Sequence, residues 1–400
     1  MEKRKLSIIF TGGTIAMVEG EDHKLRPPKD PREFAKALPQ LFSNYLISMK
    51  YVLNKDSTDM RPGDWEKIVQ AVHEELARQP DGIVVVHGVD TICFSASATA
   101  YALGPGLSLP VVFTGAQLPS NKVFGDAMAN LTRSAEVATH PDSPPEVMVL
   151  FNTMAFRATR AQKKDDKAFD AVESPAFPPL VTVKEPLERS SRSDRRRPKK
   201  GEAGGSGLSA CMNRFSTGIL PIILSPGNLP QLFEMAIEKE PDRCKGIILF
   251  SFGGATIPNV EKDESDQRLP ENDERYYSYL PLIKKAYGHC IPLLIASHYP
   301  TIATSADLYE SGSAAQDAGA IPVGGYVLPS LVSKFSWILA HTEHLRNDMK
   351  IRNTIIEKLM KSPYVGEIGE TDFTTSEFWA SLREPAEQPS ENNRLSSSTA

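Results

Sequence analysis

Seven short, continuously apolar runs are the feature of this sequence that most restricts its fold. They occupy residues 6–10, 82–86, 111–114, 147–151, 219–224, 245–250 and 291–296. A strand with one face in water alternates apolar and polar residues. A continuous run instead indicates a strand that is covered on both faces, as in a parallel sheet.

Segments with helical periodicity lie between these runs. Apolar residues at positions 65, 68, 69, 72 and 76 form one stripe of an amphipathic helix, with Asp64 as its predicted N-cap. A second helix is predicted over residues 95–103. Strands that alternate with helices predict an α/β fold with right-handed crossovers.

The length of 400 residues exceeds what one compact core usually holds, so two domains are expected. We expect a large N-terminal domain at residues 1–188, a basic and Gly/Ser-rich linker at residues 189–217 and a smaller C-terminal α/β domain at residues 218–347. A helical extension at residues 348–383 and a disordered tail at residues 384–400 should follow. The linker and the tail contain little that a folded core could bury. Basic residues between positions 192 and 200 could contact an acidic partner, although a solvated linker is the interpretation that the composition favours.

Charge and cysteine content narrow the class of protein. The formal net charge of −5 gives no overall attraction to nucleic acid or to an anionic membrane. The apolar start at residues 6–10 is too short for a signal peptide or a membrane-spanning helix. Four cysteines are scattered without a Cys-x-x-Cys pair, namely Cys93, Cys211, Cys244 and Cys290. This pattern fits a reducing compartment, so we expect a cytoplasmic protein with no nucleic-acid and no membrane partner.

Polar residues directly follow three of the predicted strands. Phe-Thr-Gly-Gly-Thr-Ile-Ala occupies residues 10–16, His-Gly-Val-Asp-Thr residues 87–91, and Thr-Gly-Ala-Gln residues 114–117. Ligands of open α/β sheets bind beyond the carboxyl ends of the strands, so three such ends at one edge predict a pocket. The glycines permit tight turns whose backbone N–H groups come close to a ligand.

Each of these clusters also has an ordinary structural explanation. The hydroxyl of Thr14 could act as a nucleophile if a base removes its proton, or the residue could simply cap a strand–turn. Asp90 could hold a substrate ammonium group or cap the helix that follows. The first cluster lacks the third glycine of a dinucleotide fingerprint and the Gly-Lys-Ser/Thr of a P-loop, which disfavours phosphate binding.

Taken in order, these motifs resemble those of the L-asparaginase/glutaminase family, and most of all its cytoplasmic type I branch. Asp-Ser-Thr-Asp-Met at 56–60 and Arg-Ala-Thr-Arg-Ala-Gln-Lys at 157–163 add to the resemblance, as do Phe-Asp at 169–170 and Ser-Pro at 174–175. The resemblance spans residues 5–345, apart from residues 189–215. It implies a large N-terminal α/β domain with a mostly parallel sheet and a smaller, flavodoxin-like C-terminal α/β domain.

The resemblance also implies a role for each site residue. Thr14 would form an acyl-enzyme with the amide carbon of the substrate, while Asp90 and Lys163 would complete the catalytic group. Five residues would contact the substrate: Ser57, Thr58, Gly88, Val89 and Gln117. Backbone N–H groups of the second motif would stabilise the oxyanion. Without the resemblance, Lys163 would be taken for a surface lysine.

Partners and cofactors follow from the same resemblance. The substrate would be a small-molecule amide, and no metal or organic cofactor is implied. Relatives complete each site with residues of a neighbouring subunit, so a homodimer or homotetramer is expected. The region expected to contribute, residues 324–334, contains Pro329 where relatives have a glutamate.

Two further positions depart from the family's pattern. Val89 stands where the family has a threonine whose hydroxyl links Lys163 to the reacting centre, and valine has no proton to relay. The loop over residues 18–30 contains no tyrosine, which the type I branch carries there, and Lys24 or His23 could supply the missing base and suit a different substrate. Acid–base assistance is worth about 10²–10⁴-fold in rate, so a slow enzyme or none is expected.

Several functions therefore stay open. The first is an amidohydrolase that acts on asparagine or a related small amide. A second is a binding or regulatory protein that holds an amino acid without turnover, which Val89 favours. A third is an amidase with a changed substrate. An RNA-linked amidotransferase component of the same superfamily is less expected, because such proteins carry an additional domain before the first motif, which here begins at Thr11.

Overall fold

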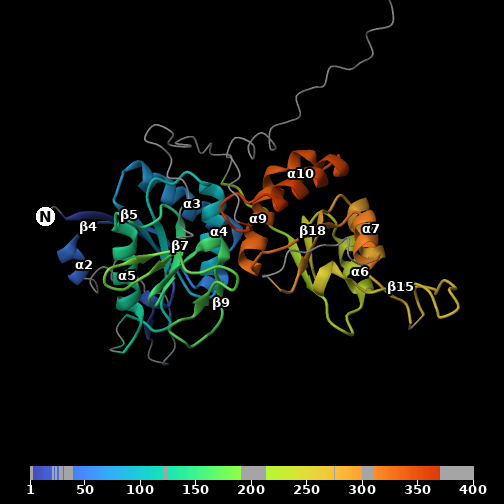
Figure 1. Ribbon diagram of the computed structural model, residues 1–400, viewed down its shortest axis with the longest axis horizontal. Coiled ribbons are helices and arrows are strands. Elements are labelled where there is room, and N and C mark those ends of the chain that lie inside the picture. The colour runs from blue at the N-terminus through green and yellow to red at the C-terminus, as the bar shows by residue number, and fades with distance from the viewer. Residues whose placement is uncertain are drawn as a thin grey trace, which may run out of the picture.

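The chain folds into two α/β bodies that lie side by side, each built around its own sheet (Figure 1). The structure is a computed structural model that describes residues 3–19, 22, 25–26, 30, 39–120, 122, 124–190, 213–273, 275–299 and 310–369. The predicted linker lies almost entirely outside the described residues, as do His23, Lys24 and the predicted tail. The predicted helical extension is described up to residue 369.

An eight-stranded sheet forms the first body. In spatial order its strands are β12 (Glu188–Arg189), β11 (Val181–Thr182), β8 (Met154–Arg157), β7 (Val147–Phe151), β6 (Val111–Thr114), β5 (Gly82–Val86), β1 (Arg4–Gly12) and β4 (Tyr45–Lys55). The five strands from β7 to β4 run parallel, and the other three are antiparallel to their neighbours. The predicted mostly parallel sheet is thus confirmed.

Helices cover both faces of this sheet. On one face lie α3 (Pro62–Ala77) and α4 (Ile92–Leu103), and on the other lie α5 (Ala127–Thr139) and α2 (Pro39–Asn44). Alternate strand residues face opposite layers, so Ile83 and Val85 pack toward α3 and α4 while Val84 and Val86 pack toward α5. All of β5 is buried, and this explains its continuously apolar sequence.

Two local expectations need correction. Asp64 is not the N-cap of α3, because Arg61 holds that position and the Asp64 carboxylate accepts a 3.2 Å hydrogen bond from the Arg61 backbone N–H. Asp64 also pairs with the Lys55 ammonium at 2.8 Å, which ties the helix start to the end of β4. The strand β4 was not expected from the apolar runs, because it is a half-buried edge strand with polar residues along its length.

A smaller, fully parallel sheet forms the second body. Its strands follow chain order: β13 (Ile219–Ile223), β14 (Gly246–Ser251), β17 (Leu293–Ser297) and β18 (Ile321–Val323). One face is covered by α6 (Pro230–Lys239), α7 (Leu280–Gly288) and α8 (Glu310–Asp317), and the other by α9 (Leu328–His341). The layered α/β arrangement agrees with the prediction. The strand order is sequential and differs from the 2-1-3-4-5 order of flavodoxin itself.

Three two-stranded pairs and a last helix complete the described strands and α-helices. The hairpins pair β2 (Val18–Glu19) with β3 (Leu25–Arg26), β9 (Gln162–Lys163) with β10 (Val172–Glu173), and β15 (Asn259–Val260) with β16 (Tyr277–Ser278). The β15 hairpin projects from the far end of the second body (Figure 1). Helix α10 (Met349–Lys361) lies beside α9 and β18.

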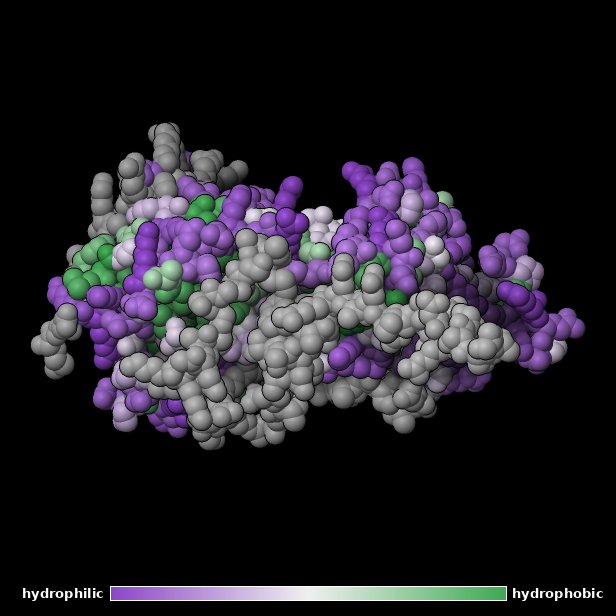
Figure 2. Space-filling model, turned by 90° about the horizontal axis from the view of Figure 1, so that it is seen from above, coloured by the Kyte–Doolittle hydropathy of each residue, from purple (hydrophilic) through white to green (hydrophobic). Residues whose placement is uncertain are grey.

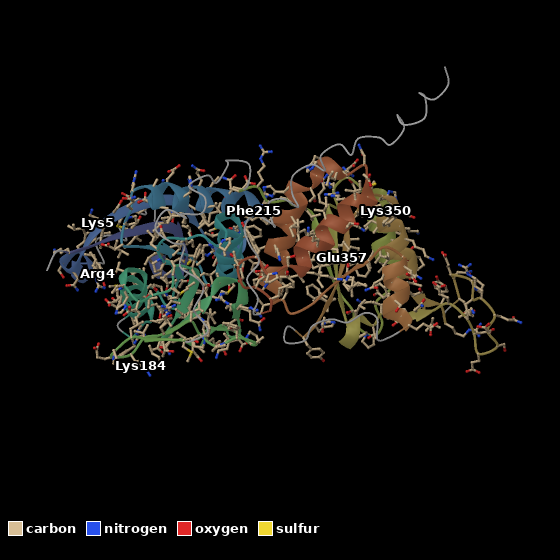
Figure 3. The ribbon with its side chains drawn as sticks, turned by 45° about the horizontal axis from the view of Figure 1, so that its top comes forward. Arg4, Lys5, Lys184, Phe215, Lys350 and Glu357 are labelled. Carbon is tan, nitrogen blue, oxygen red and sulfur yellow. The ribbon has the colours of Figure 1, made fainter. Side chains whose placement is uncertain are left out.

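One apolar core joins the two bodies. Side chains of α3, α4 and the first sheet pack with side chains of α9 and the second sheet in a single cluster. At the junction the Ser333 hydroxyl of α9 donates to the Phe94 carbonyl of α4 at 3.0 Å. Phe215, labelled between the bodies in Figure 3, packs edge-on against Trp65 of α3 with ring centroids 5.5 Å apart. The two bodies are therefore held by packed side chains.

The surface is largely hydrophilic from above, with hydrophobic residues near the end that carries β4 and α2 (Figure 2). Leu46 of β4 is 51% exposed there. Beside it is a hollow of about 360 Å³ whose lining includes Ser7, Glu75 and Arg78, at the amino ends of the strands. Among the described residues, no helix has the length and apolar character needed to cross a membrane.

After α10, residues 362–369 turn back to the first body, and we call them the C-terminal hook. Glu367 of the hook forms an ion pair with Lys334 of α9, and both side chains have 0% exposure. The Lys334 ammonium also donates to the Ser362 carbonyl at 2.8 Å. Burial alone would raise the pKa of Glu367, but Lys334 and backbone N–H donors outweigh burial and hold that pKa below its ordinary value. Glu367 therefore stays ionised, and the hook depends on a cation from the second body.

Replacing Lys334 with methionine should destabilise the fold. Methionine retains an apolar stem, but the Glu367 carboxylate is then buried without its cation. We expect the free energy of unfolding to fall by about 3–5 kcal/mol in urea denaturation followed by circular dichroism. The double variant Lys334→Met/Glu367→Gln should recover part of this loss. A loss below about 1 kcal/mol in the single variant, the value of an exposed pair, would contradict the expectation.

Candidate active site

Four neighbouring strands, β4, β1, β5 and β6, end at the same edge of the first sheet. The register pairs Phe10 with Val86 and Val86 with Thr114, so the strand ends are level. The segments that leave from this edge are the short helices η2 (Ser57–Asp59) and η1 (Thr14–Ala16), the turn at residues 87–91 and the turn at residues 115–117. The strand order thus gathers polar segments from four parts of the sequence.

Two glycines set how closely these segments meet. Gly13 has a φ of 92°, and a Cβ atom on it would lie 2.4 Å from the backbone nitrogen of Gly88. A Cβ atom on Gly88 would lie 2.6 Å from the Oγ atom of Ser57 and 3.3 Å from the Cα atom of Gly13. Gly88 therefore lies against both Gly13 and Ser57, at distances that leave no room for a side chain on either glycine. Thr14 follows immediately and is half-buried.

The Ser57 turn is fixed from both sides. Ser57 is 2% exposed, and its carbonyl accepts a 2.7 Å hydrogen bond from the Thr91 hydroxyl. The Asp56 carboxylate accepts from both the backbone N–H and the hydroxyl of Thr58, each at 3.0 Å. The hydroxyl of Thr58 thus stabilises the turn itself, while its side chain is exposed. Ser57 is placed better than Thr58 to face a ligand held between the strand ends.

Val89 packs into the apolar core on the α3 and α4 side of the sheet. Its side chain is 5% exposed and belongs to the same cluster as Ile92 and Phe113. A Cβ atom added to Gly115 would lie 3.5 Å from its Cγ2 atom, an ordinary van der Waals contact. The valine is therefore well accommodated, but it offers neither a donor nor an acceptor at the turn.

Lys163 forms two ion pairs. Its ammonium lies 2.6 Å from Asp90 and 2.5 Å from Asp166, and its side chain is 19% exposed. Burial by itself would lower the pKa of Lys163, but the hydrogen bonds that its ammonium donates to Asp166 and Asp90 outweigh burial and raise the pKa above its ordinary value. The lysine is therefore protonated at neutral pH. In this arrangement it can hold charge and position Asp90, but it cannot accept a proton.

Gln117 connects the β6 turn with the loop that carries Lys163. Its side-chain amide donates to the carbonyl of Ala168 at 3.2 Å. Its backbone N–H donates to the Asp126 carboxylate at 3.0 Å, and the Leu118 N–H donates to the same carboxylate at 3.1 Å. Asp126 is 5% exposed and makes no side-chain cap on α5, so its function is to hold the turn.

Sequence reasoning missed Asp126 and Asp166. Asp126 stands directly before a helix, where an aspartate ordinarily predicts a cap, and nothing local indicates that it faces back to the β6 turn. Asp166 lies in a run of charged residues that resembles an exposed loop. Its pairing with Lys163 follows from the β9–β10 hairpin, which has too few residues to show a strand pattern.

Five of the predicted site residues are placed by two sets of contacts. Gly88 lies against the Ser57 side chain and against Gly13, the residue before Thr14, and Asp90 and Lys163 form an ion pair. Pro329 is buried at the first turn of α9. In the part of the chain that the structure describes, no group of three or more His, Cys, Asp or Glu side chains is arranged to hold a metal ion.

His87 precedes Gly88 and is completely buried. Its Nδ1 atom lies 2.8 Å from the Gly88 carbonyl. Burial lowers the pKa of His87 to about 4, although the hydrogen bond to Gly88 opposes the shift. The imidazole is therefore neutral at physiological pH and supports the turn without charge.

This buried histidine should make stability depend on pH. In the unfolded chain the imidazole takes up a proton below its ordinary pKa of 6.5, whereas in the fold it stays neutral down to about 4. Stability is therefore full above pH 6.5 and is lost toward pH 4, by on the order of 3 kcal/mol. Chemical denaturation across this range measures the loss, which His87→Gln should reduce. The control His73→Gln, on α3, should keep the wild-type slope, and an equal slope in both variants would contradict the assignment.

Comparison with known proteins links this geometry to a family. Residues 5–194 match the sequence model of the family described as "Asparaginase, N-terminal". The chain is similar to a glutamyl-tRNA(Gln) amidotransferase subunit of Aeropyrum pernix, with 28% identity over 375 residues that cover 92% of this chain and 80% of the relative. The protein of the same name from Pyrococcus abyssi is 27% identical over 373 residues, which cover 91% of this chain and 76% of the relative.

Solved structures with the same fold are L-asparaginases. The thermostable L-asparaginase of Thermococcus kodakarensis superimposes with a TM-score of 0.71 at 26% identity, covering 91% of this chain and 99% of that one. L-asparaginase I of Vibrio cholerae gives a TM-score of 0.68 at 22% identity, covering 87% and 97% of the two chains. At 22% identity, the similarity to the Vibrio cholerae structure shows only that the fold is shared. The predicted two-body α/β fold is confirmed over nearly the whole length of these structures.

Proposed function

We propose that this chain, which belongs to the asparaginase family, is an amidohydrolase that releases ammonia from a small amide through an acyl-enzyme on Thr14. Asparagine and glutamine are the two substrates to consider first. The structural relatives are named for asparagine, and the relatives by sequence are named for an amidotransferase that acts on Glu-tRNA(Gln). A cytoplasmic homodimer or homotetramer is part of the proposal.

The close approach of Gly88 to both Gly13 and Ser57 is the observation that carries this proposal. It surrounds the segment that begins with Thr14 with a buried hydroxyl and with backbone N–H groups. In the proposed complex Ser57 binds the α-carboxylate of the substrate and Asp90 binds its α-ammonium. The amide carbon is then directed to Thr14, and N–H groups of the 87–91 turn stabilise the oxyanion, which is worth a few kcal/mol.

The proposed reaction has two steps. The Thr14 oxygen forms a bond to the amide carbon, the carbon–nitrogen bond breaks, and the hydroxyl proton leaves with ammonia. Water then attacks the resulting ester, which releases the free acid and restores the hydroxyl of Thr14. Each step needs a group that moves a proton near Thr14.

Proton transfer is the weak part of this site. Val89 has no hydroxyl, and Lys163 is held protonated between two carboxylates. Loss of one acid–base group typically costs about 10²–10⁴-fold in rate. We therefore propose a slow amidohydrolase rather than an efficient one.

The same observation favours a second candidate function. A protein that retains Ser57 and Asp90 but cannot move the proton would bind an amino acid and leave it intact. Such a protein would act as a binding or regulatory component on the asparaginase scaffold. An amidase with a changed substrate is a related alternative, since an apolar Val89 leaves the turn less polar than a threonine would.

Ammonia release by the wild-type protein and by Thr14→Ala separates these functions. Purified full-length protein is incubated with asparagine or glutamine, and ammonia, intact mass and calorimetric binding are measured. The proposal predicts slow release by wild type and at least a 10²-fold loss in Thr14→Ala. Binding without release or adduct supports the second candidate. Equal release by both proteins would contradict the proposed nucleophile.

Replacing Val89 with threonine should increase turnover. Threonine has nearly the same shape and returns a hydroxyl next to Asp90, so we expect a rise of roughly 10²-fold in kcat with a smaller change in KM. Val89→Ala is the matched control, because it changes the packing without adding a hydroxyl. An unchanged kcat in Val89→Thr, with the fold intact by circular dichroism, would contradict the claim that proton transfer needs a hydroxyl at position 89.

A further inference from the structure

The C-terminal hook ends on the segment that leads to Lys163. That segment is the short helix η3 (Ala158–Arg160) between β8 and β9. The guanidinium of Arg160 donates to the carbonyl of Gly366 at 2.8 Å and to the carbonyl of Gly369 at 3.1 Å. Arg160 is 7% exposed, so these bonds are shielded from water. More than 200 residues of sequence separate the two partners.

The hook presents these carbonyls from a fixed position. The Glu367 carboxylate accepts from the backbone N–H groups of Tyr364 and Val365, at 3.0 and 2.8 Å, and pairs with the ammonium of Lys334. The turn is thus closed by a buried ion pair and by its own backbone. Gly366 therefore has little freedom to follow Arg160 if the η3 segment moves.

Arg160 is three residues before Lys163, and backbone hydrogen bonds restrict the short segment between them. The N–H of Ala161 donates to the Ala158 carbonyl at 3.3 Å, and Lys163 itself pairs with Val172 in the β9–β10 hairpin. The Ala158 carbonyl also accepts a 3.0 Å hydrogen bond from the Ser97 hydroxyl of α4. Helix α4 begins two residues after Asp90. The two partners of the Asp90–Lys163 ion pair are therefore carried by elements that meet at η3.

The strand before η3 has its own anchor. Arg157 pairs with Glu146 through two hydrogen bonds, at 2.6 and 3.0 Å, and this pair fixes the end of β8. The Arg157 guanidinium also donates to the Gly366 carbonyl of the hook, at 3.5 Å. The bonds from Arg160 to the hook are additional to that anchor. Their effect falls on the residues that follow, which are the ones that lead to Lys163.

We infer that the C-terminal hook positions the active-site lysine, with Arg160 and Glu367 as positioning residues that act through η3. The catalytic importance of Lys163 in this inference rests on the proposed function. Whether the hook fixes the position of Lys163 can be tested without measuring turnover. Through its bonds to the hook, Arg160 fixes the point at which the chain leaves η3 toward Lys163. Glu367 fixes the position of the hook carbonyls that accept from Arg160. Through this chain of contacts the second body and its C-terminal segment determine the geometry of a site that lies in the first body.

The test compares full-length Arg160→Ala and Arg160→Lys with wild type. Hydrogen exchange followed by mass spectrometry, with no substrate present, should show exchange in peptides over residues 158–168 that is faster by on the order of tenfold in Arg160→Ala. Peptides of α5 should be unchanged. Arg160→Lys retains one donor and should be intermediate. Labelling Lys163 by reductive ¹³C-methylation and following its NMR titration should show the pKa of Lys163 falling toward its ordinary value in Arg160→Ala.

Kinetics add a second readout. In Arg160→Ala, kcat/KM for ammonia release should fall by roughly tenfold or more, because a misplaced Lys163 displaces Asp90, the proposed ligand of the substrate ammonium, and a misplacement of 1 Å can cost about 10²-fold in rate. Glu367→Gln should reproduce the effect from the hook side. The matched control is Arg352→Ala, which removes a buried arginine of α10 that donates to Glu343 and has no bond to η3.

Each outcome has one meaning. Unchanged exchange over residues 158–168 and an unchanged Lys163 titration in a folded Arg160→Ala would overturn the inference. Equal effects in Arg352→Ala would also overturn it, because they would indicate general destabilisation. If wild type releases no ammonia, the proposed function fails, and the exchange and titration results still decide whether the hook positions the lysine. If Arg160→Ala does not fold, Arg160→Lys and Glu367→Gln provide the same readouts.

Discussion

The close approach of Gly13 to Gly88 is the constraint on which the site depends. A single added carbon on either glycine would overlap the backbone of its neighbour or the Ser57 side chain. This approach is possible because β1 and β5 are adjacent and parallel and end at the same level. It places Thr14, Ser57 and the 87–91 turn around one point, although they come from three separate regions of the sequence. The helices on both faces of the sheet serve to hold these strand ends in register.

Much of this arrangement was predictable, because buried parallel strands have continuously apolar sequences. The run at 82–86 became β5 without any change of boundary, since every one of its residues is buried. The edge strand β4 has no continuously apolar run, because Ser48 and Lys50 interrupt its apolar residues and most of its side chains are half-buried. The C-terminal hook was also unpredictable. Lys334 and Glu367 are charged residues in ordinary sequence surroundings, and only the packing of α9 against α4 buries them together.

The candidate site shows the same division between local and long-range information. Thr14, Asp90 and Gln117 could be chosen from sequence because each follows a strand. Asp126, which binds the Gln117 backbone, and Asp166, which pairs with Lys163, could not be chosen, because they meet their partners across turns. The consequence is chemical as well as structural. A lysine between two carboxylates stays protonated, and Val89, next to Asp90 in the sequence, carries no hydroxyl, so the site binds charge more readily than it moves a proton.

The central claim is that the oxygen of Thr14 forms a bond to the amide carbon of a bound amino acid. Its most direct test is to incubate the wild-type protein with diazoketone analogues of asparagine and glutamine and to locate any covalent label by peptide mass mapping. The account predicts one label, on the peptide that contains Thr14, and protection by the matching amino acid. A label on another residue, or saturable binding of both analogues without any label at Thr14, would contradict it.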